Sequence, residues 1–199
     1  MLWWAAYSFP KSFVETYPDK QLDVVEIDEW ITKIAKEHFG LQEYSNLSIY
    51  HSDARVFLNT SEKKYDAILW DAFGSYYSIP YQLTTLEVAQ KKYDLLNENG
   101  VVILNVISSL EWEKAKFLES EYKTYQEVFP EVFIIAVRDA SDRENTQNIM
   151  LIAAKNAETI NLSSENSELQ SYIDKKEYLN IPKDTKILTD DYAPVDYYI

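Results

Sequence analysis

Two short runs of apolar residues constrain the fold of this chain more than any other feature. Residues 67–70 and 101–107 are almost wholly apolar, as in strands that are covered on both faces. Such strands occur mainly in parallel sheets, whose helical connections cross over with a right-handed turn. Each run therefore predicts a buried strand of a parallel α/β sheet. Asp71 comes directly after the first run.

The rest of the chain supports this prediction, because expected strands alternate with expected helices. We expect helices over residues 8–17, 28–39, 84–96 and 110–129, with shorter helical stretches at 53–58 and 169–179. Besides the two apolar runs, we expect strands over residues 22–27, 47–50, 132–137 and 149–153. The last two are separated by a polar loop that suits an antiparallel hairpin at the edge of the sheet. The predicted fold class is therefore α/β, with a mostly parallel sheet.

Local signals set several of these limits. Gly40 is the expected stop of the helix that Asp28 opens, and Thr84 or Thr85 is the expected N-cap of the helix before the second apolar run. Asn99-Gly100 is the expected turn into that run.

Composition narrows the classes of function. The net charge of −14 argues against nucleic acid or an anionic membrane as a partner. It would attract a small cationic substrate, but many soluble proteins are simply acidic, and that is the simpler interpretation. There is no cysteine, and His38 and His51 show no metal-ligand spacing, so we expect no metal and assign neither histidine a role. No segment approaches the roughly 18–20 apolar residues that a membrane span needs. The expected location is cytoplasmic.

Acidic residues follow three successive expected strands: Glu26 and Asp28, then Asp53, then Asp71. The carboxyl ends of adjacent parallel strands meet at one edge, where α/β folds bind ligands. Each acid alone is as well explained as a helix cap or turn residue, but three in succession indicate a crevice. In nucleotide-binding folds Glu26 would accept from ribose hydroxyls, Asp53 from the adenine amine, and Asp71 would face the reacting group.

The segments DVVEIDEW, SDARVFL, KYDAILWDAF, SIPYQLTTLE, NENGVVILNVIS and LTDDYAPVDY resemble the spermidine synthase family, within the class I S-adenosylmethionine-dependent methyltransferase superfamily. The resemblance covers about residues 7–153, with the tail at 188–195 added. It implies a Rossmann-like class I methyltransferase sheet. It also implies a nucleoside-binding domain over residues 1–155 and a C-terminal extension, 156–199, that packs on the same domain.

The resemblance implies transfer of an aminopropyl group from decarboxylated S-adenosylmethionine to an amine, as in polyamine biosynthesis, without a metal. Glu26 matches the family's ribose-binding glutamate and Asp53 its adenine-contacting aspartate, with Asp28 and Ala54 as further cofactor-binding residues. Asp71 matches the catalytic aspartate that orients or deprotonates the acceptor amine. A carboxylate can both hold an ammonium group and take its proton.

Tyrosines near the expected crevice have two interpretations each. Tyr76, with Tyr77 and Tyr81, either forms a lid over the crevice or buries against a partner subunit. Tyr192, in the aromatic tail, either lines the acceptor side or packs on the domain. Tyr76 and Tyr192 are the candidate substrate-binding residues. We expect a monomer or a homodimer.

Two departures from the family leave the activity open. Trp3-Trp4-Ala5 stands where the family has a run of glycines, which lets the backbone approach the cofactor, and the first strand is missing or reduced to residues 2–6. We therefore expect an N-terminally truncated or misread version of a longer protein. Gly74 stands where polyamine synthases usually carry a second aspartate. The alternatives are a methyltransferase that uses S-adenosylmethionine and a catalytically inactive domain of the same fold.

Overall fold

The computed structural model describes residues 7–71, 79–158 and 160–198, and its contacts divide the chain into two units. The first unit ends at Thr60 and the second begins at Ser61. Both sides of the expected domain boundary at residues 155 and 156 lie in the second unit. The expected first strand, with Trp3 and Trp4, lies outside the described residues.

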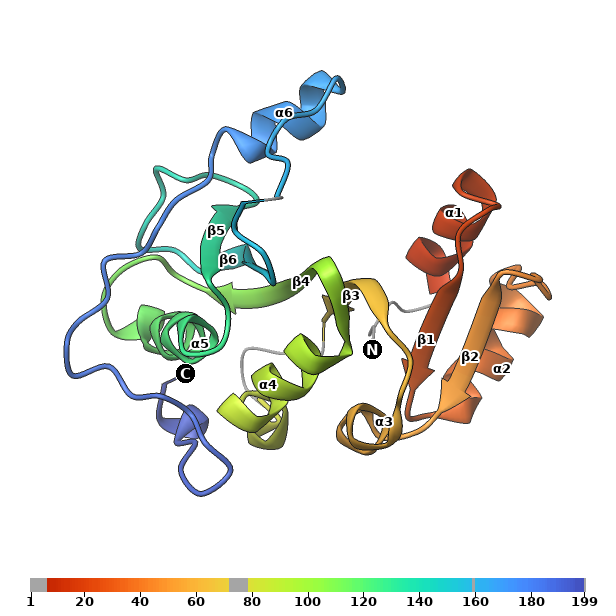
Figure 1. The fold of residues 1–199 in the computed structure, drawn as a ribbon, viewed down its shortest axis with the longest axis horizontal. Coiled ribbons are helices and arrows are strands. Elements are labelled where there is room, and N and C mark those ends of the chain that lie inside the picture. Colours follow the sequence, from red (N-terminus) through yellow and green to blue (C-terminus); the bar gives the residue numbers. More distant parts are fainter. Residues whose placement is uncertain (1–6, 72–78, 159, 199) are drawn as a thin grey trace. The chain divides into compact units, whose positions relative to one another are not determined.

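Over its described residues, the first unit contains two parallel strands and three helices, whose order along the chain can be followed in Figure 1. Strands β1 (Leu22–Glu26) and β2 (Leu47–His51) are paired in parallel, with Glu26 opposite His51. The helices are α1 (Ser8–Thr16), α2 (Glu29–His38) and α3 (Ala54–Thr60). The buried core is formed by Tyr7, Val24, Ala35 and Leu41, with Leu22, Ile31, Tyr44, Leu47 and Ile49 packed against it. The predicted order of strands and helices is confirmed here.

The limits of α2 follow from local chemistry. Asp28 is its N-cap, and its side chain accepts from the backbone N–H of Trp30 at 2.8 Å. Gly40 has a φ of +69°, a left-handed conformation that glycine adopts without strain. The backbone N–H of the following Leu41 donates to Ala35 O at 3.1 Å. The predicted start and stop of this helix are therefore both confirmed.

The second unit is built on a four-stranded sheet in the order β3–β4–β6–β5. Its strands are β3 (Tyr65–Trp70), β4 (Leu96–Ser108), β5 (Glu131–Ala136) and β6 (Gln147–Ala154). Strand β3 pairs in parallel with β4, whereas β6 pairs antiparallel with both β4 and β5. The α/β class, with parallel pairs followed by an antiparallel edge hairpin, is confirmed.

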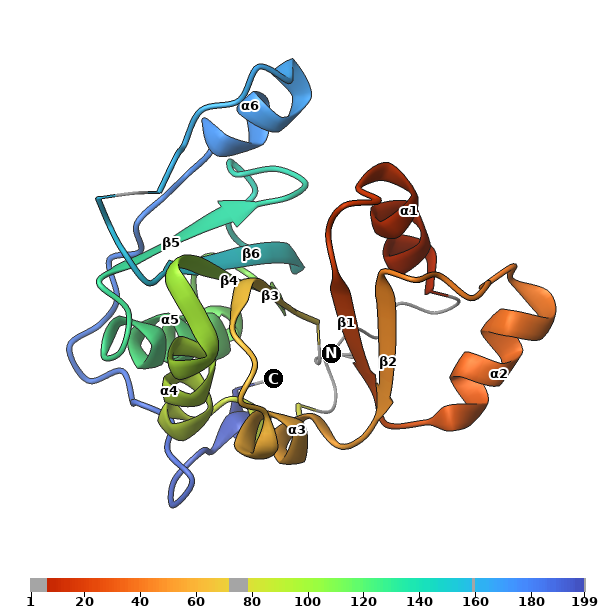
Figure 2. The same ribbon diagram turned by 45° about the vertical axis from the view of Figure 1, so that its right-hand side comes forward.

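Helices α4 (Leu86–Leu95) and α5 (Lys116–Gln126) lie side by side on one face of this sheet (Figure 1 and Figure 2). Helix α6 (Ser167–Ile173) follows β6 along the chain. Short 3-10 helices occur at Tyr81–Leu83, Glu113–Ala115 and Val195–Tyr197. Thr85 is the N-cap of α4 by position, but its hydroxyl donates to Asp190 Oδ1 at 2.7 Å. The predicted cap residue is right, although its side chain binds the C-terminal tail instead.

Burial of β3 on both faces is a wrong prediction. Asp66 and Ala67 are exposed, and only Trp70, at the carboxyl end, is buried. Among the described residues, β3 is an edge strand of the four-stranded sheet and pairs only with β4, so it is less covered than a central strand. In the central strand β4, residues 101–108 alternate between half-buried and buried, so the second apolar run behaves as predicted.

The expected turn at Asn99-Gly100 is also wrong, since both residues lie within β4. The pairing register shifts there: Tyr65 pairs with Leu96 but Ala67 pairs with Val101, so residues 97–100 bulge opposite Asp66. A Cβ at Gly100 would lie 2.9 Å from Leu96 Cβ. Gly100 is therefore required by this close approach.

The helix expected over residues 110–129 begins later, at Lys116. The backbone N–H groups of Leu110 and Glu111 donate to Arg143 O at 2.8 and 3.1 Å, and Trp112 has a φ of +68°. A residue with this φ cannot belong to a right-handed α-helix, so the helix begins only after Trp112. The apolar periodicity alone could not show this interruption.

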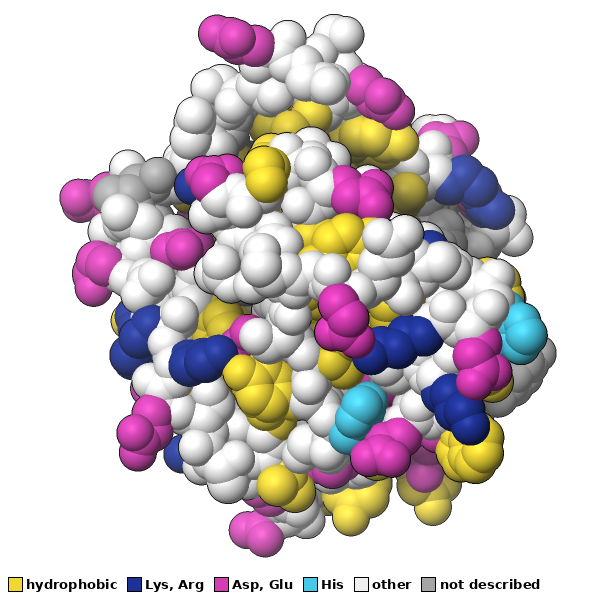
Figure 3. All heavy atoms as spheres, turned by 90° about the vertical axis from the view of Figure 1, so that its right-hand side faces the viewer, with side chains coloured by type: hydrophobic (Ala, Val, Ile, Leu, Met, Phe, Trp, Pro, Cys, Tyr) yellow, Lys and Arg dark blue, Asp and Glu magenta, His cyan; other side chains and the backbone are white. Residues whose placement is uncertain are grey.

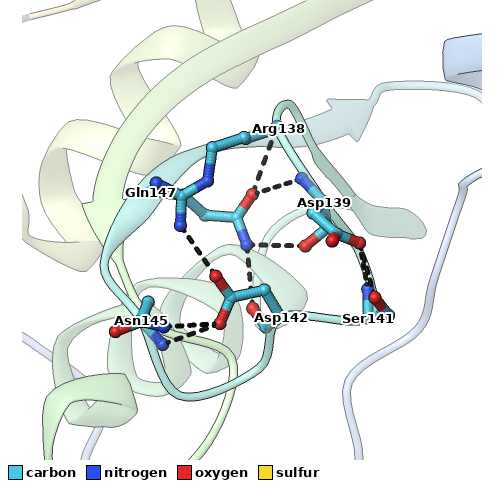
Figure 4. Close-up of polar contacts among 6 residues, drawn as sticks. All are labelled: Arg138, Asp139, Ser141, Asp142, Asn145 and Gln147. Atoms are coloured by element: carbon cyan, nitrogen blue, oxygen red, sulfur yellow. Dashed lines mark hydrogen bonds and ion pairs between the residues drawn. The ribbon is translucent and has the colours of Figure 1, made fainter.

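Gln147 organises the loop between β5 and β6 (Figure 4). Its buried side chain accepts from the backbone N–H groups of Arg138 and Asp139 at 3.2 and 3.0 Å. It also donates to the carbonyls of Asp139 and Asp142 at 2.8 and 3.0 Å. The predicted hairpin is confirmed by the antiparallel pairing, and this amide satisfies the backbone of its loop.

The C-terminal tail is held on the second unit. Glu177 exchanges two backbone hydrogen bonds with Ile134, both at 2.9 Å. Leu86 donates to Leu188 O at 2.8 Å, and Leu188 and Val195 are fully buried. The tail therefore anchors itself through these two aliphatic residues.

Candidate active site

Glu26 lies at the carboxyl end of β1 and is 6% exposed. Its Oε1 accepts from the backbone N–H of Asp28 at 2.9 Å. Its carbonyl accepts from the N–H of Ser52, just after β2, at 3.1 Å. These bonds hold the glutamate and connect it to the segment that carries Asp53.

Asp28 and Asp53 both cap helices. Asp28 Oδ1 accepts from Trp30 N–H, and Asp53 Oδ1 accepts from the N–H groups of Arg55 and Val56 at 2.8 and 3.0 Å. The cap interpretation, kept open from the sequence, is therefore correct for both residues. It does not exclude a second role, because a carboxylate has two oxygens and several acceptor positions.

The parallel pairing of β1 and β2 brings Glu26, Asp28 and Asp53 to the same edge of that strand pair. Ala54, the first residue of α3, is 2% exposed, so its side chain belongs to the core. The structure thus assembles three of the predicted acids within the first unit. Their ligand-binding roles stay predictions.

A polar chain that the sequence did not reveal lies beside Glu26. The Tyr7 hydroxyl is 2.6 Å from Thr32 Oγ1, which is 3.0 Å from His51 Nε2. Burial raises the pKa of the Tyr7 hydroxyl, the hydrogen bond with Thr32 opposes this, and the charge of Glu26 adds to it. These residues are far apart in sequence, so no local pattern pointed to the chain.

Asp71 follows β3 in the second unit and is half-buried. Its Oδ1 accepts from Asn105 Nδ2 on β4 at 2.9 Å. The opposite amide atom, Asn105 Oδ1, is buried and has no hydrogen-bond partner among the described residues. The only sequence signal for Asn105 was that it is the single polar residue in the run 101–107. The structure makes it the partner that orients the predicted catalytic carboxylate.

The residue before Asp71 contacts a buried cluster of ionisable groups. The indole of Trp70 is 2% exposed, and Lys92 Nζ lies 3.5 Å from the ring centroid. Lys92 donates to the Tyr125 hydroxyl at 2.6 Å. Glu121 is also fully buried. Burial lowers the pKa of Lys92, and the charge of Glu121 opposes this effect. Lys92, Glu121 and Tyr125 carried no sequence signal.

The predicted substrate-binding tyrosines are placed unequally. Tyr192 is 55% exposed and lies in a turn in which it exchanges backbone bonds with Thr189 at 2.9 and 3.0 Å. The tail therefore packs through Leu188 and Val195 rather than through this ring. Tyr76, with Gly74 and Tyr77, lies outside the described residues.

Two further expectations concern absences. Among residues 7–71, 79–158 and 160–198, no group of three or more metal-ligating side chains occurs. No helix in this described part is long and apolar enough to cross a membrane. On the face shown in Figure 3, acidic and basic side chains are interspersed, without one extended basic area among its described residues.

The parallel strand pairs, the antiparallel edge hairpin and the helices between strands define an α/β protein with a class I methyltransferase-like sheet. Residues 12–163 match the family described as Spermine/spermidine synthase domain. The chain belongs to this family.

The polyamine aminopropyltransferase of Vibrio vulnificus (strain CMCP6) is 30% identical to this chain over 202 residues, which is 95% of this chain and 65% of the relative. The chain thus spans less than two thirds of that relative's length.

Two crystal structures are similar in fold. A probable spermidine synthase from Corynebacterium glutamicum ATCC 13032 has a TM-score of 0.74 at 21% identity, covering 94% of this chain and 69% of that chain. Human methyltransferase-like protein 13 in complex with SAH has a TM-score of 0.67 at 21% identity, covering 94% and 85%. At this level of identity, both similarities show the fold alone.

Proposed function

We propose that this protein is an aminopropyltransferase that moves the aminopropyl group of decarboxylated S-adenosylmethionine to a small cationic amine, as in polyamine biosynthesis. Membership of the spermine/spermidine synthase family supports this proposal, as does the name of the Vibrio relative. The observation that carries it is the Asp71 carboxylate at the end of β3, oriented by the amide of Asn105. A fixed carboxylate of this kind suits an ammonium acceptor.

The co-substrate would be held by the first unit. Glu26 would accept hydrogen bonds from the ribose hydroxyls, because a buried carboxylate at the end of a strand is the usual ribose ligand in such folds. Asp53 would accept from the adenine amine through the oxygen that does not cap α3. Asp28 lies two residues after Glu26, and Ala54 directly follows Asp53. We propose that both also contribute to binding of the co-substrate.

The transfer itself needs little covalent chemistry from the protein. Asp71 holds the acceptor ammonium and takes one proton, which leaves a nitrogen lone pair. That lone pair attacks the methylene carbon beside the sulfonium. A C–N bond forms, the C–S bond breaks, and its electron pair goes to sulfur, so that neutral methylthioadenosine leaves. Positioning of the two substrates supplies most of the rate enhancement.

The net charge of −14 favours encounter with a cationic amine through the overall field. We further propose that the protein acts in the cytoplasm without a metal, a nucleic acid or a membrane, as a monomer or homodimer. Light scattering on a size-exclusion column decides between these two states.

The test of the catalytic role is Asp71→Asn, assayed by release of methylthioadenosine from decarboxylated S-adenosylmethionine with a panel of polyamines. Asparagine keeps an acceptor for Asn105 but cannot take a proton, so we expect kcat to fall about 10²–10⁴-fold. Asp66→Asn is the matched control, since Asp66 on the same strand accepts from Asn97 Nδ2 at 2.7 Å. Equal rates in wild type and Asp71→Asn would refute the role.

Calorimetric titration with methylthioadenosine tests the first unit. Glu26→Gln and Asp53→Asn remove a charge while keeping the local hydrogen bonds, and each should weaken binding about 10–100-fold. Methyl transfer from S-adenosylmethionine, without aminopropyl transfer, would favour the methyltransferase alternative. No binding by the folded protein would favour the inactive domain.

A further inference from the structure

Trp112 combines two unfavourable features. Its backbone has a φ of +68° and a ψ of −165°, a conformation that residues other than glycine rarely adopt and that is costly for a bulky side chain. Its indole is 72% exposed, so burial of the ring offsets little of this cost. Glycine would avoid both disadvantages at this position. Because strained residues cluster at ligand sites, the exposed ring on a strained backbone indicates that a ligand uses it.

The segment around Trp112 is held by side chains that the strand end supplies. Ser108 and Ser109 are 0% exposed. Ser108 Oγ donates to Lys114 O at 2.8 Å, and Ser109 Oγ donates to Glu111 O at 2.7 Å. These bonds lie on both sides of Trp112 along the chain. A strained conformation persists only where its surroundings over-determine it, so these bonds keep the backbone that carries the indole in one place.

Trp112 follows the same edge of the sheet as Asp71, because β3 and β4 run parallel and Trp112 comes after the carboxyl end of β4. Asn105, the partner of Asp71, is three residues before Ser108, the last residue of β4. This is about 10 Å along a strand. The bond from Ser108 to Lys114 O fixes the turn that carries Trp112 at this end of β4. The turn therefore lies farther along β4 than the level of Asp71.

An exposed indole at this place suits a cationic ligand. The face of a tryptophan ring attracts an ammonium group more strongly than the face of tyrosine or phenylalanine does. The net charge of −14 favours cations near the surface as well. In the proposed reaction, Asp71 holds one nitrogen of the acceptor. A second contact at the end of β4, about 10 Å farther along the strand, requires an acceptor with another ammonium group far from the first.

We propose that Trp112 is a specificity-determining residue: its indole binds a distal ammonium group of a long polyamine, a tri- or tetraamine, whose terminal nitrogen is held by Asp71. The reaction itself rests on the proposed function. Binding of a long polyamine at Trp112 is a property of the free protein and can be measured without it.

NMR on the isotope-labelled full chain tests this binding. The indole N–H signal of Trp112 is assigned by its loss in Trp112→Phe. Titration with spermine, a tetraamine, should shift this signal to saturation, whereas 1,4-diaminobutane should shift it much less. Magnesium chloride at the same ionic strength controls for screening. The indole of Trp30, which is 65% exposed, is the internal control. No shift at Trp112 with spermine, or equal shifts at Trp112 and Trp30, would overturn the proposal.

Steady-state kinetics test the specificity. Trp112→Ala should raise KM for tri- and tetraamine acceptors about 5–30-fold, and leave KM for 1,4-diaminobutane and for the adenosyl co-substrate unchanged. Trp30→Ala is the matched control and should change none of these values. Transfer to the diamine alone, or equal changes of KM for short and long amines, would overturn the proposal. If wild type transfers to no amine, the proposed function fails, and the NMR titration still decides whether Trp112 binds the polyamine.

Thermal unfolding checks the cost of the backbone conformation separately. Trp112→Gly and Trp112→Ala both remove the ring, but only glycine adopts this φ without strain. The glycine variant should therefore unfold about 2–4 °C above the alanine variant, with the same loss of amine affinity. Equal Tm values would overturn the proposal, because the exposed ring would then be carried at no cost in strain.

Discussion

Burial of Lys92 and Glu121 makes the pH dependence of stability predictable. The pKa of Glu121 is raised from 4.5 to about 8 in the folded protein. Between these values the unfolded chain has released this proton and the folded protein keeps it, so the free energy of unfolding falls as pH rises. The pKa of Lys92 is lowered from 10.5 to about 7. Up to pH 10.5 the unfolded chain keeps a proton that the folded protein has lost, so stability rises with pH.

The two contributions oppose each other between about pH 7 and 8, where the stability contributed by this pair is therefore lowest. Near pH 7.5 these pKa values leave both groups uncharged, but a buried polar group without a hydrogen-bond partner, such as Glu121 among the described residues, still costs about 1–3 kcal/mol. We expect a gain of this size for Lys92→Met/Glu121→Leu near pH 7.5, with smaller gains on both sides. The fully buried positions of both side chains place this change in the core.

Urea unfolding at about pH 5.5, 7.5 and 9.5, with the free energy extrapolated to water, measures this profile. The control is Lys91→Met/Glu127→Leu, which makes the same changes at exposed positions of α4 and at the end of α5. The reasoning is refuted if the buried double variant is less stable than wild type at neutral pH, or if both double variants show the same profile.

Three further changes test local features. Gly100→Ala should lower stability by about 1–3 kcal/mol, because its Cβ would lie 2.9 Å from Leu96 Cβ; thermal unfolding measures the loss, and an unchanged Tm would contradict the geometry. Gln147→Leu should cost about 1–3 kcal/mol, since it removes the partner of two backbone N–H groups, including that of Asp139; hydrogen exchange should speed up in the hairpin loop and not in α2. Asp53→Ala should cost about 1 kcal/mol in urea unfolding and Asp53→Asn much less, because asparagine is also an N-cap; equal losses would mean that the cap bonds contribute nothing.

Much of the fold could be predicted because its signals are local. Asp28 and Gly40 mark the ends of α2 through a side-chain cap and a left-handed residue, and both act within a few residues. The apolar run of β4 and the hairpin of β5 and β6 were predictable from period and loop composition. The length of the helix after β4 was not, because the φ of +68° at Trp112 interrupts the segment before Lys116.

The residues of the candidate site likewise fall into those that a local sequence pattern revealed and those that only the structure revealed. Glu26, Asp53 and Asp71 were found because acids directly follow strands, a pattern written in consecutive residues. Asn105 and Lys92 were not found, because each acquires its partner only when β4 or α4 packs beside β3.

By itself, the sequence determined the class of sheet, most strand and helix limits, and which carboxylates end which strands, because these follow from hydrogen bonding and burial within a few neighbouring residues. The tertiary structure decided which amide orients Asp71 and which charged side chains are enclosed. Lys92 and Glu121 look like ordinary charged positions of two helices, and only the packing of those helices removes them from water. The cost of removing a charge depends on what surrounds it in space, which the order of residues along the chain does not specify.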